Sequence, residues 1–232
     1  MERIANRVVD IGDFKFNSAD RLGQGAQATV YRGIQLSDNK TVAIKEIIRT
    51  HEEVYERYQR DEIANLKITS HKNIIKLYYH EWGERELYQV IEYCEQGDLN
   101  NFLESRETRL SDEELLSFMS DCADGLSYLH SYKPAIIHRD LKAENVLVQN
   151  EQTNVVLKLT DFGFSLRAAK DATTYCGSPN YIAPEVYPDS KGNVRYNLMA
   201  DIFSLGILYE GLLNHQPGRK VVPIKGNDNN QM

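Results

Sequence analysis

Three oxygen-bearing side chains flank a short apolar stretch in the middle of the chain. Asp140 and Asn145 precede this stretch and Asp161 follows it. The stretch predicts a hairpin with strands at residues 146–148 and 155–159, so the three side chains lie on the loops that enter and leave it. Their oxygens can therefore converge on one small volume. Such hard oxygen ligands suit a magnesium ion that carries substrate phosphates, and an additional carboxylate suits acceptance of a proton from a hydroxyl.

A glycine pair near the N-terminus, Gly23 and Gly25, predicts a second phosphate contact. Glycine lets the backbone approach a phosphate closely, although a Gly-x-Gly pair alone also fits a plain hairpin or a dinucleotide-binding turn. The dinucleotide version needs a helix directly after the glycines. Residues 29–31 are instead typical of a strand. This pattern excludes a dinucleotide-dependent enzyme and favours a glycine loop between two strands.

Two further segments are expected to position polar side chains. Residues 41–45 alternate like a strand and end at Lys45. Residues 51–69 carry apolar residues at helical spacing and predict a helix that includes Glu62. Strand lysines and helical glutamates are more often solvated than functional. A functional role for Lys45 and Glu62 is therefore indicated only by the rest of the pattern.

Composition limits the class of protein. The chain has 232 residues, of which 41% are hydrophobic and 26% charged, as expected for a soluble globular protein. A net charge of -7 argues against nucleic acid or an anionic membrane as the main partner. The three cysteines lack metal-ligand spacing, which indicates reduced thiols. We expect a cytoplasmic protein without a signal peptide or a transmembrane segment.

Ordered motifs carry a resemblance to a known family. His138-Arg139-Asp140, Asp161-Phe162-Gly163 and Ala183-Pro184-Glu185 occur in the order found in protein kinases, and the likeness covers residues 14–213. Lys142 and Gly177-Ser178-Pro179 resemble serine/threonine kinases. The glycine segment and residues 176–185 are similar to ULK-type, autophagy-initiating kinases.

The resemblance implies an α+β, two-lobe protein-kinase-like fold. An antiparallel sheet lobe would occupy residues 14–93, after an N-terminal extension at residues 1–13. A mainly helical lobe lacking its last helices would occupy residues 94–213. Residues 214–232 are polar and are expected to be a disordered tail.

The resemblance also implies roles for individual residues. Lys45 would hold the α- and β-phosphates of ATP with support from Glu62, for which Glu56 and Asp61 are weaker alternatives. Asp140 would accept the proton of the substrate hydroxyl, and Lys142 would steady the γ-phosphate. Asn145 and Asp161 would bind Mg²⁺. The other residues assigned to the ATP site are Leu22, Gly23, Gly25, Val30, Ala43, Ile91, Glu92, Cys94, Asp98 and Leu147.

The segment between the Asp161 and Ala183 motifs would be the activation segment, with Thr174, and secondarily Thr173, as regulatory phosphorylation sites. The sequence thus predicts an ATP-dependent serine/threonine protein kinase that acts on protein substrates, with a regulatory or scaffold protein as a further partner at an exposed surface of the helical lobe. The alternative is a weakly active or inactive nucleotide-binding or scaffolding module, which the shortened helical lobe favours. The complete set of phosphate and metal residues favours the enzyme.

Overall fold

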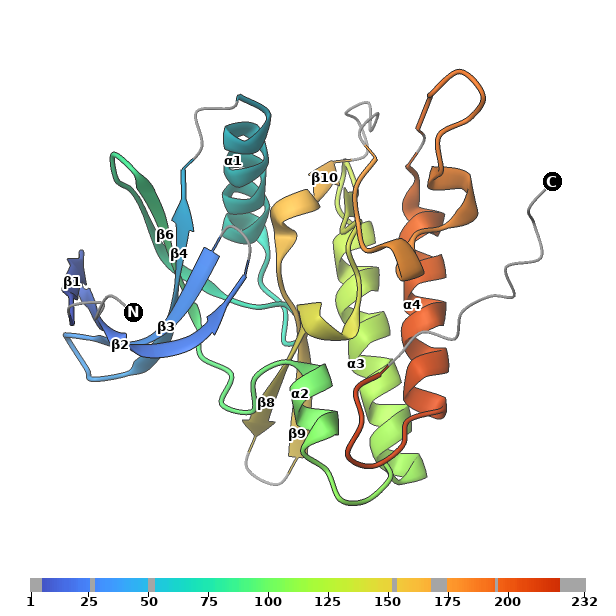
Figure 1. Ribbon diagram of the computed structural model, residues 1–232, viewed down its shortest axis with the longest axis horizontal. Coiled ribbons are helices and arrows are strands. Elements are labelled where there is room, and N and C mark those ends of the chain that lie inside the picture. The colour runs from blue at the N-terminus through green and yellow to red at the C-terminus, as the bar shows by residue number, and fades with distance from the viewer. Residues whose placement is uncertain are drawn as a thin grey trace, which may run out of the picture. The chain divides into compact units, whose positions relative to one another are not determined.

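The chain divides into two compact units in the computed structural model (Figure 1). Unit 1 comprises Met1–Lys67 and Ile75–Cys94, and unit 2 comprises Ile68–Ile74 and Glu95–Met232. The residues that the structure describes are 6–25, 28–49, 53–151, 154–167, 175–194 and 196–221.

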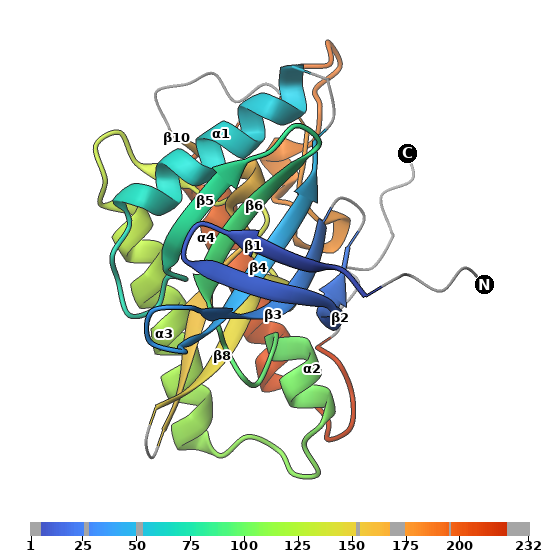
Figure 2. The same ribbon diagram turned by 90° about the vertical axis from the view of Figure 1, so that its left-hand side faces the viewer.

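Unit 1 contains a six-stranded antiparallel sheet with helix α1 beside it (Figure 2). The strand order is β1-β2-β3-β4-β6-β5, so the chain returns through α1 before the last two strands pair. The elements are β1 (Val8–Ile11), β2 (Phe14–Gln24), β3 (Ala28–Gln35), β4 (Thr41–Ile48), α1 (Glu53–Ile68), β5 (Leu77–Trp82) and β6 (Glu86–Glu92).

The two faces of this sheet bury different residues, because side chains alternate along each strand. One face holds an apolar cluster of eight buried residues from β1 to β4 and β6, among them Phe16, Ile44 and Val90. A second cluster joins Ile63 of α1 to Ile47 and Leu87. Burial of these side chains holds α1 against the sheet.

Unit 2 is mainly helical and also contains two small two-stranded sheets. Strands β8 and β9 form the hairpin that the sequence predicts, with Val146 opposite Leu159. The elements are α2 (Leu99–Glu104), α3 (Asp112–His130), β7 (Ile136–Ile137), β8 (Val146–Glu151), β9 (Asn154–Leu159), β10 (Leu166–Arg167) and α4 (Leu198–Leu213), with short 3₁₀ turns at Ala143–Asn145, Phe162–Phe164, Pro179–Tyr181 and Pro184–Val186.

Helix α3 is the centre of unit 2 and lies beside α4 (Figure 1). It begins at a capping box in which Ser111 and Glu114 satisfy each other's backbone N–H groups. Glycine is required at Gly125, since a Cβ atom there would lie 2.8 Å from the carbonyl oxygen of Asn73. This close approach lets α3 pack on β9 and on the segment Ile68–Ile74, which contains Asn73.

The α+β class with a sheet-containing unit and a mainly helical unit is confirmed. Two segments differ from expectation. Residues 8–11 of the expected extension form β1, which pairs with β2. Part of the expected disordered tail is packed, since Val221 is buried and its N–H donates to Asn100 Oδ1 at 2.9 Å. Further contacts hold the same segment, since the Gly218 N–H donates to the Arg106 carbonyl oxygen at 3.0 Å and His215 is buried. Composition does not reveal such contacts.

Candidate active site

In unit 1, the structure brings Lys45 and Glu62 together. Lys45 Nζ lies 3.2 Å from Glu62 Oε1, and the Glu62 side chain is only 4% exposed. Of the two alternatives, Glu56 pairs with Arg49 at 2.7 Å, and Asp61 lies 3.9 Å from Arg57. A nearly buried carboxylate against a strand lysine fixes the direction of the ammonium group.

Several residues expected at the ATP site share the sheet face of Lys45. Val30 lies directly opposite Lys45 in the β3–β4 ladder, and Ala43 lies directly opposite Ile91 in the β4–β6 ladder. Directly opposite residues project to the same face, as do residues two apart in a strand. The lysine therefore stands on a face with small and branched apolar side chains.

The glycine segment forms the turn between β2 and β3. Gly25 N–H donates to the carbonyl oxygen of Ala28 at 2.8 Å, and Leu22 near the end of β2 is exposed. A Cβ atom on Gly23 would meet no atom within 4 Å among the residues that the structure describes. Packing of the described chain thus does not require glycine there, which agrees with space kept for a ligand. Ala26 and Gln27 lie outside the described residues.

Glu92 and Cys94 end unit 1, and Asp98 and Leu147 belong to unit 2. Glu92 is half-buried in β6 and Cys94 is buried. Asp98 caps α2 by accepting the N–H of Asn101 at 2.9 Å, and it pairs with Leu147 in an isolated β-bridge. Asp98 thus has a structural role as the N-cap of α2, and its role at the ATP site remains a prediction.

The carboxylate of Asp140 is the centre of a hydrogen-bond network in unit 2. Its Oδ1 accepts the hydroxyl of Ser178 at 2.8 Å, and its Oδ2 lies 3.2 Å from Lys142 Nζ. Lys142 Nζ also donates to the Ser178 hydroxyl at 2.7 Å. Asp140 is buried, so these contacts act in a medium of low polarity. An aspartate, a lysine and a hydroxyl are thereby held in mutual contact.

Asn145 is oriented by the same carboxylate. Its Nδ2 donates to Oδ2 of Asp140 at 2.9 Å and to the Asp140 carbonyl oxygen at 2.8 Å. Both amide hydrogens are used in this way, so Oδ1 is directed elsewhere and can accept or coordinate. Asp161 is exposed and adopts the left-handed conformation, with φ of 61°. The two oxygen donors fit Mg²⁺, which keeps few protein ligands and takes phosphate oxygens and water for the rest.

Asp201 has a role that the sequence did not reveal. This fully buried carboxylate accepts the N–H of His138 at 2.8 Å and the N–H of Arg139 at 2.9 Å. His130 Nε2 lies 2.9 Å from the same group. The sequence held one indication of this role, an aspartate within a largely apolar helix. A buried charge must have partners, so such a residue is expected to accept hydrogen bonds.

Residues 138–145 form the loop that the family resemblance predicts to be catalytic, and the backbone of this catalytic loop is strained where Asp201 holds it. Arg139 has a positive φ of 69°, which is uncommon for a side chain other than glycine and clusters at functional sites. His138 also anchors the loop, since its Nε2 lies 3.0 Å from the Thr160 carbonyl oxygen and its ring packs 5.2 Å from that of Phe162.

A neutral phenol lies close to the loop. Burial and the carboxylates of Glu144 and Asp140 raise the pKa of Tyr181 to about 12.

Thr173 and Thr174, the expected phosphorylation sites, lie outside the described residues.

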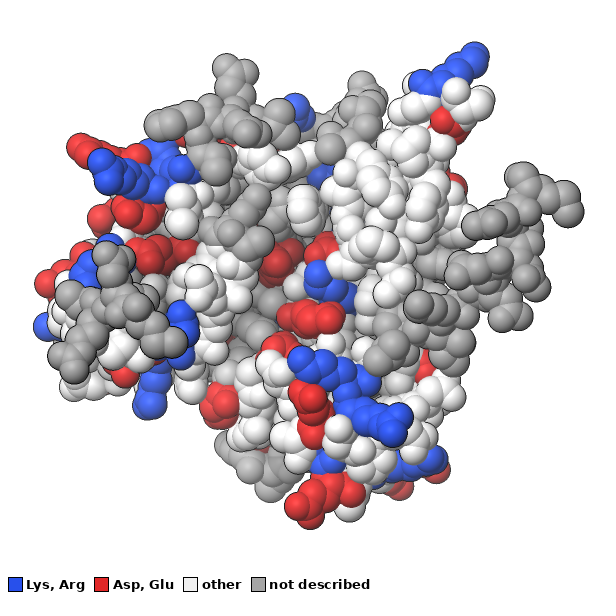
Figure 3. Space-filling view, in the orientation of Figure 1, with Lys and Arg blue, Asp and Glu red and all other residues white. Residues whose placement is uncertain are grey.

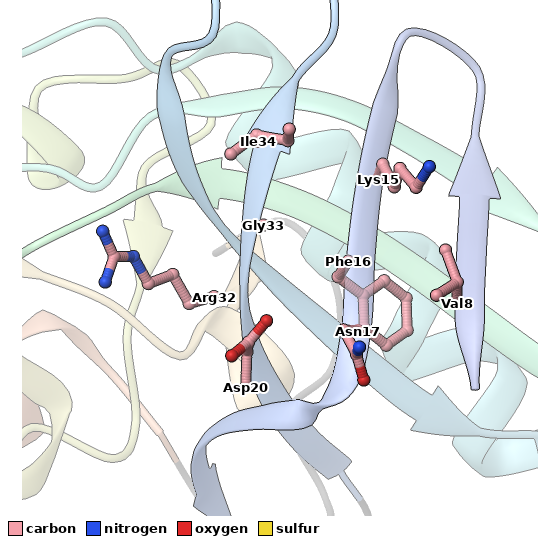
Figure 4. Close-up of a pocket in the computed structure, with 8 residues that line it drawn as sticks. All are labelled: Val8, Lys15, Phe16, Asn17, Asp20, Arg32, Gly33 and Ile34. Carbon is pink, nitrogen blue, oxygen red and sulfur yellow. The ribbon is translucent and has the colours of Figure 1, made fainter. Parts of the chain in front are cut away.

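A pocket of about 400 Å³ on β1 to β3 lies apart from the predicted residues, none of which lines it (Figure 4).

On the face of the molecule shown in Figure 3, acidic and basic side chains are mixed. In the described part of the chain, no helix is long and apolar enough to cross a membrane.

Comparison with known proteins places these features in a family. The model of the protein kinase domain matches residues 16–230. The chain belongs to the protein kinase family. Its kinase fold therefore accounts for the order of the three motifs and for the sheet unit and helical unit.

Individual relatives narrow the placement. The chain is 33% identical to serine/threonine-protein kinase atg1 of Dictyostelium discoideum over 89% of its length, and 35% identical to serine/threonine-protein kinase ULK1 of Homo sapiens over 89%. It is 34% identical to serine/threonine-protein kinase ATG1a of Arabidopsis thaliana over 96%. The predicted resemblance to ULK-type kinases is confirmed. The chain spans 31%, 20% and 34% of these three relatives.

Proposed function

We propose that this chain is an ATP-dependent serine/threonine protein kinase that transfers the γ-phosphate of ATP to protein hydroxyls. The observation that carries the proposal is the contact of the Ser178 hydroxyl with Asp140 and Lys142. A serine hydroxyl already donates to the carboxylate that would serve as the base. A substrate hydroxyl needs the same acceptor, at the same distance, to be aligned for attack.

The other groups would provide position and charge. Lys45, held by Glu62, would bind the α- and β-phosphates, and Asn145 and Asp161 would hold Mg²⁺. The magnesium ion would neutralise charge on the phosphates when bound. Most of the catalytic effect is expected from positioning and charge stabilisation, because phosphoryl transfer needs little covalent help from the protein.

Substrates and partners are proposed at the level of chemistry. The resemblance to ULK-type kinases favours a role in initiating autophagy. We also propose a cytoplasmic location, on which the comparisons have no bearing. A regulatory or scaffold protein is a suitable partner for unit 2, because Met199, Ile202, Phe203 and Leu213 of α4 are exposed.

The test is transfer of radiolabelled phosphate from ATP to a generic basic protein by the purified 232-residue chain. Asp140→Asn, which keeps size and removes the carboxylate charge, is the matched control. Magnesium-dependent transfer by the parent, and at least a 100-fold lower rate in the variant, would support the proposal. ATP binding with equal, background-level label in both proteins would instead favour the nucleotide-binding module.

A further inference from the structure

Four side chains of unit 1 meet beside α1, and we call them the Trp82 clamp. Arg49 follows β4, Glu56 and Arg60 lie on α1, and Trp82 ends β5. The guanidinium carbons of Arg49 and Arg60 lie 5.4 Å and 5.1 Å from the centre of the Trp82 ring. Both distances are within the range of cation–π attraction.

Arg49 connects three elements through its guanidinium group. Nη1 donates to the carbonyl oxygen of Gly83 at 2.7 Å, and Nη2 donates to Glu56 Oε1 at 2.7 Å. The other carboxylate oxygen of Glu56 lies 3.9 Å from Arg60, so one carboxylate offsets two neighbouring cations. The end of β4, the turn after β5 and the first half of α1 are thereby joined at one point.

Partial burial makes the Arg49–Glu56 pair stronger than an ordinary surface pair. Its two side chains are 23% and 27% exposed. By contrast, Arg57 on the same helix is 63% exposed and lies 3.9 Å from Asp61. Exposed pairs of that kind contribute little, whereas a short pair with restricted side chains resists screening. Arg57 is therefore a matched control for Arg49.

Glu56 and Glu62 anchor α1 at two different points. Six residues correspond to about 120° around the helix axis by the shorter path and to roughly 9 Å along it. The apolar contact of Ile63 with Ile47 and Leu87 supplies attraction, but such contacts are not directional. Two polar anchors at different heights and angles fix both the rotation and the axial position of the helix.

We propose that Arg49 is a positioning residue for the phosphate-binding pair: by holding Glu56 it sets the rotation of α1 and keeps Glu62 within 3.2 Å of Lys45. The proposal rests on the proposed kinase function only where activity is the readout. Because Arg49 acts through Glu62, substitution of Arg49 should not change the environment of Lys45 further once Glu62 has been replaced.

The first measurement needs no activity. The rate at which an amine-acylating reagent modifies Lys45 is followed by mass spectrometry of the intact 232-residue chain after limited reaction and digestion. Glu62→Gln sets the rate for a lysine that has lost the charge of its Glu62 partner. Arg49→Met should raise the parental rate several-fold toward that value, and Arg49→Lys should lie between, because it keeps the charge and loses the planar fork. Arg57→Ala should match the parent.

The second measurement is kinase kinetics with the same proteins. Arg49→Met should lower kcat/KM for ATP by about tenfold, as expected for loss of roughly one charge-assisted contact. In the Glu62→Gln background, Arg49→Met should have no further effect. An equal additional loss in that background, or parental acylation of Lys45 in Arg49→Met, would overturn the proposal. Altered acylation in a chain that transfers no phosphate would support the positioning role and contradict the kinase proposal.

Discussion

The buried carboxylate of Asp201 accepts the backbone N–H of Arg139 at 2.9 Å, although 62 residues separate the two in the sequence. This bond and the bond from His138 tie the catalytic loop to helix α4. The bonds leave the loop little freedom around the strained residue Arg139. The position of Asp140, the next residue, is therefore set by α4.

Asp201→Asn should destabilise the chain and slow it as an enzyme. The amide keeps one acceptor oxygen but presents N–H groups to a site that holds two backbone donors. We expect a loss of about 2–4 kcal/mol in the free energy of unfolding, since a buried donor is left unsatisfied. Urea unfolding followed by fluorescence measures this loss. Asp112→Asn, on the first turn of α3, is a charge-matched control, and equal midpoints for the two variants would contradict the assignment.

The sequence predicted the parts of this site that depend on short-range patterns. The hairpin at β8 and β9 follows from two apolar runs, and helix α1 follows from apolar residues at helical spacing. The contact of Asp201 with the catalytic loop is different. It joins distant segments, and no local pattern encodes which backbone donors a buried carboxylate will meet.

The sequence also did not predict the strained backbone or the packing of the C-terminal segment around Val221. Arg139 and Asp161 have positive φ, which is uncommon for residues other than glycine and which the surrounding fold imposes. Val221 docks a segment that composition alone assigns to a disordered tail. In each case tertiary contacts outweigh local preference.

Phosphorylation at Thr174 should increase activity, with Thr173 as the lesser site. Arg139 directly precedes Asp140, and a guanidinium group can bind a phosphate through two parallel hydrogen bonds. Mass spectrometry of active protein should find phosphate on residue 174, and Thr174→Ala should be slower. Full activity without phosphate on residues 173–174 would refute this prediction.

Alkaline pH should destabilise unit 2. Burial, with a smaller effect of Asp121, raises the pKa of Cys122 from 9.0 to about 12. The fold thus favours the neutral thiol, so its stabilisation is complete below pH 9 and is lost as the pH rises toward 12. One thiol accounts for a slope of at most about 1.4 kcal/mol per pH unit. Urea unfolding across this range should show a smaller slope in Cys122→Ala than in the parent, and equal slopes would rule the thiol out.

The exposed side of α4 should promote self-association. Met199 and Leu213 are 60% and 61% exposed, and Ile202 and Phe203 lie on the same side of the helix. Exposed apolar side chains on one side of a helix favour association. Sedimentation velocity should show concentration-dependent oligomers that Ile202→Ser reduces. Leu116→Ser, which removes a single exposed apolar residue on α3, should leave them unchanged. A monomer at all concentrations would contradict this.

The central claim is that Lys45 and Asp161 serve one reaction, phosphate transfer from ATP. The most direct measurement compares magnesium-dependent transfer rates of the parent, Lys45→Met and Asp161→Ala. Lys40→Met serves as the control because Lys40 is an exposed lysine of the same unit. Loss of charge stabilisation predicts rates lower by about 100-fold or more in the first two variants and a parental rate in the control. Parental rates in both Lys45→Met and Asp161→Ala would contradict the account.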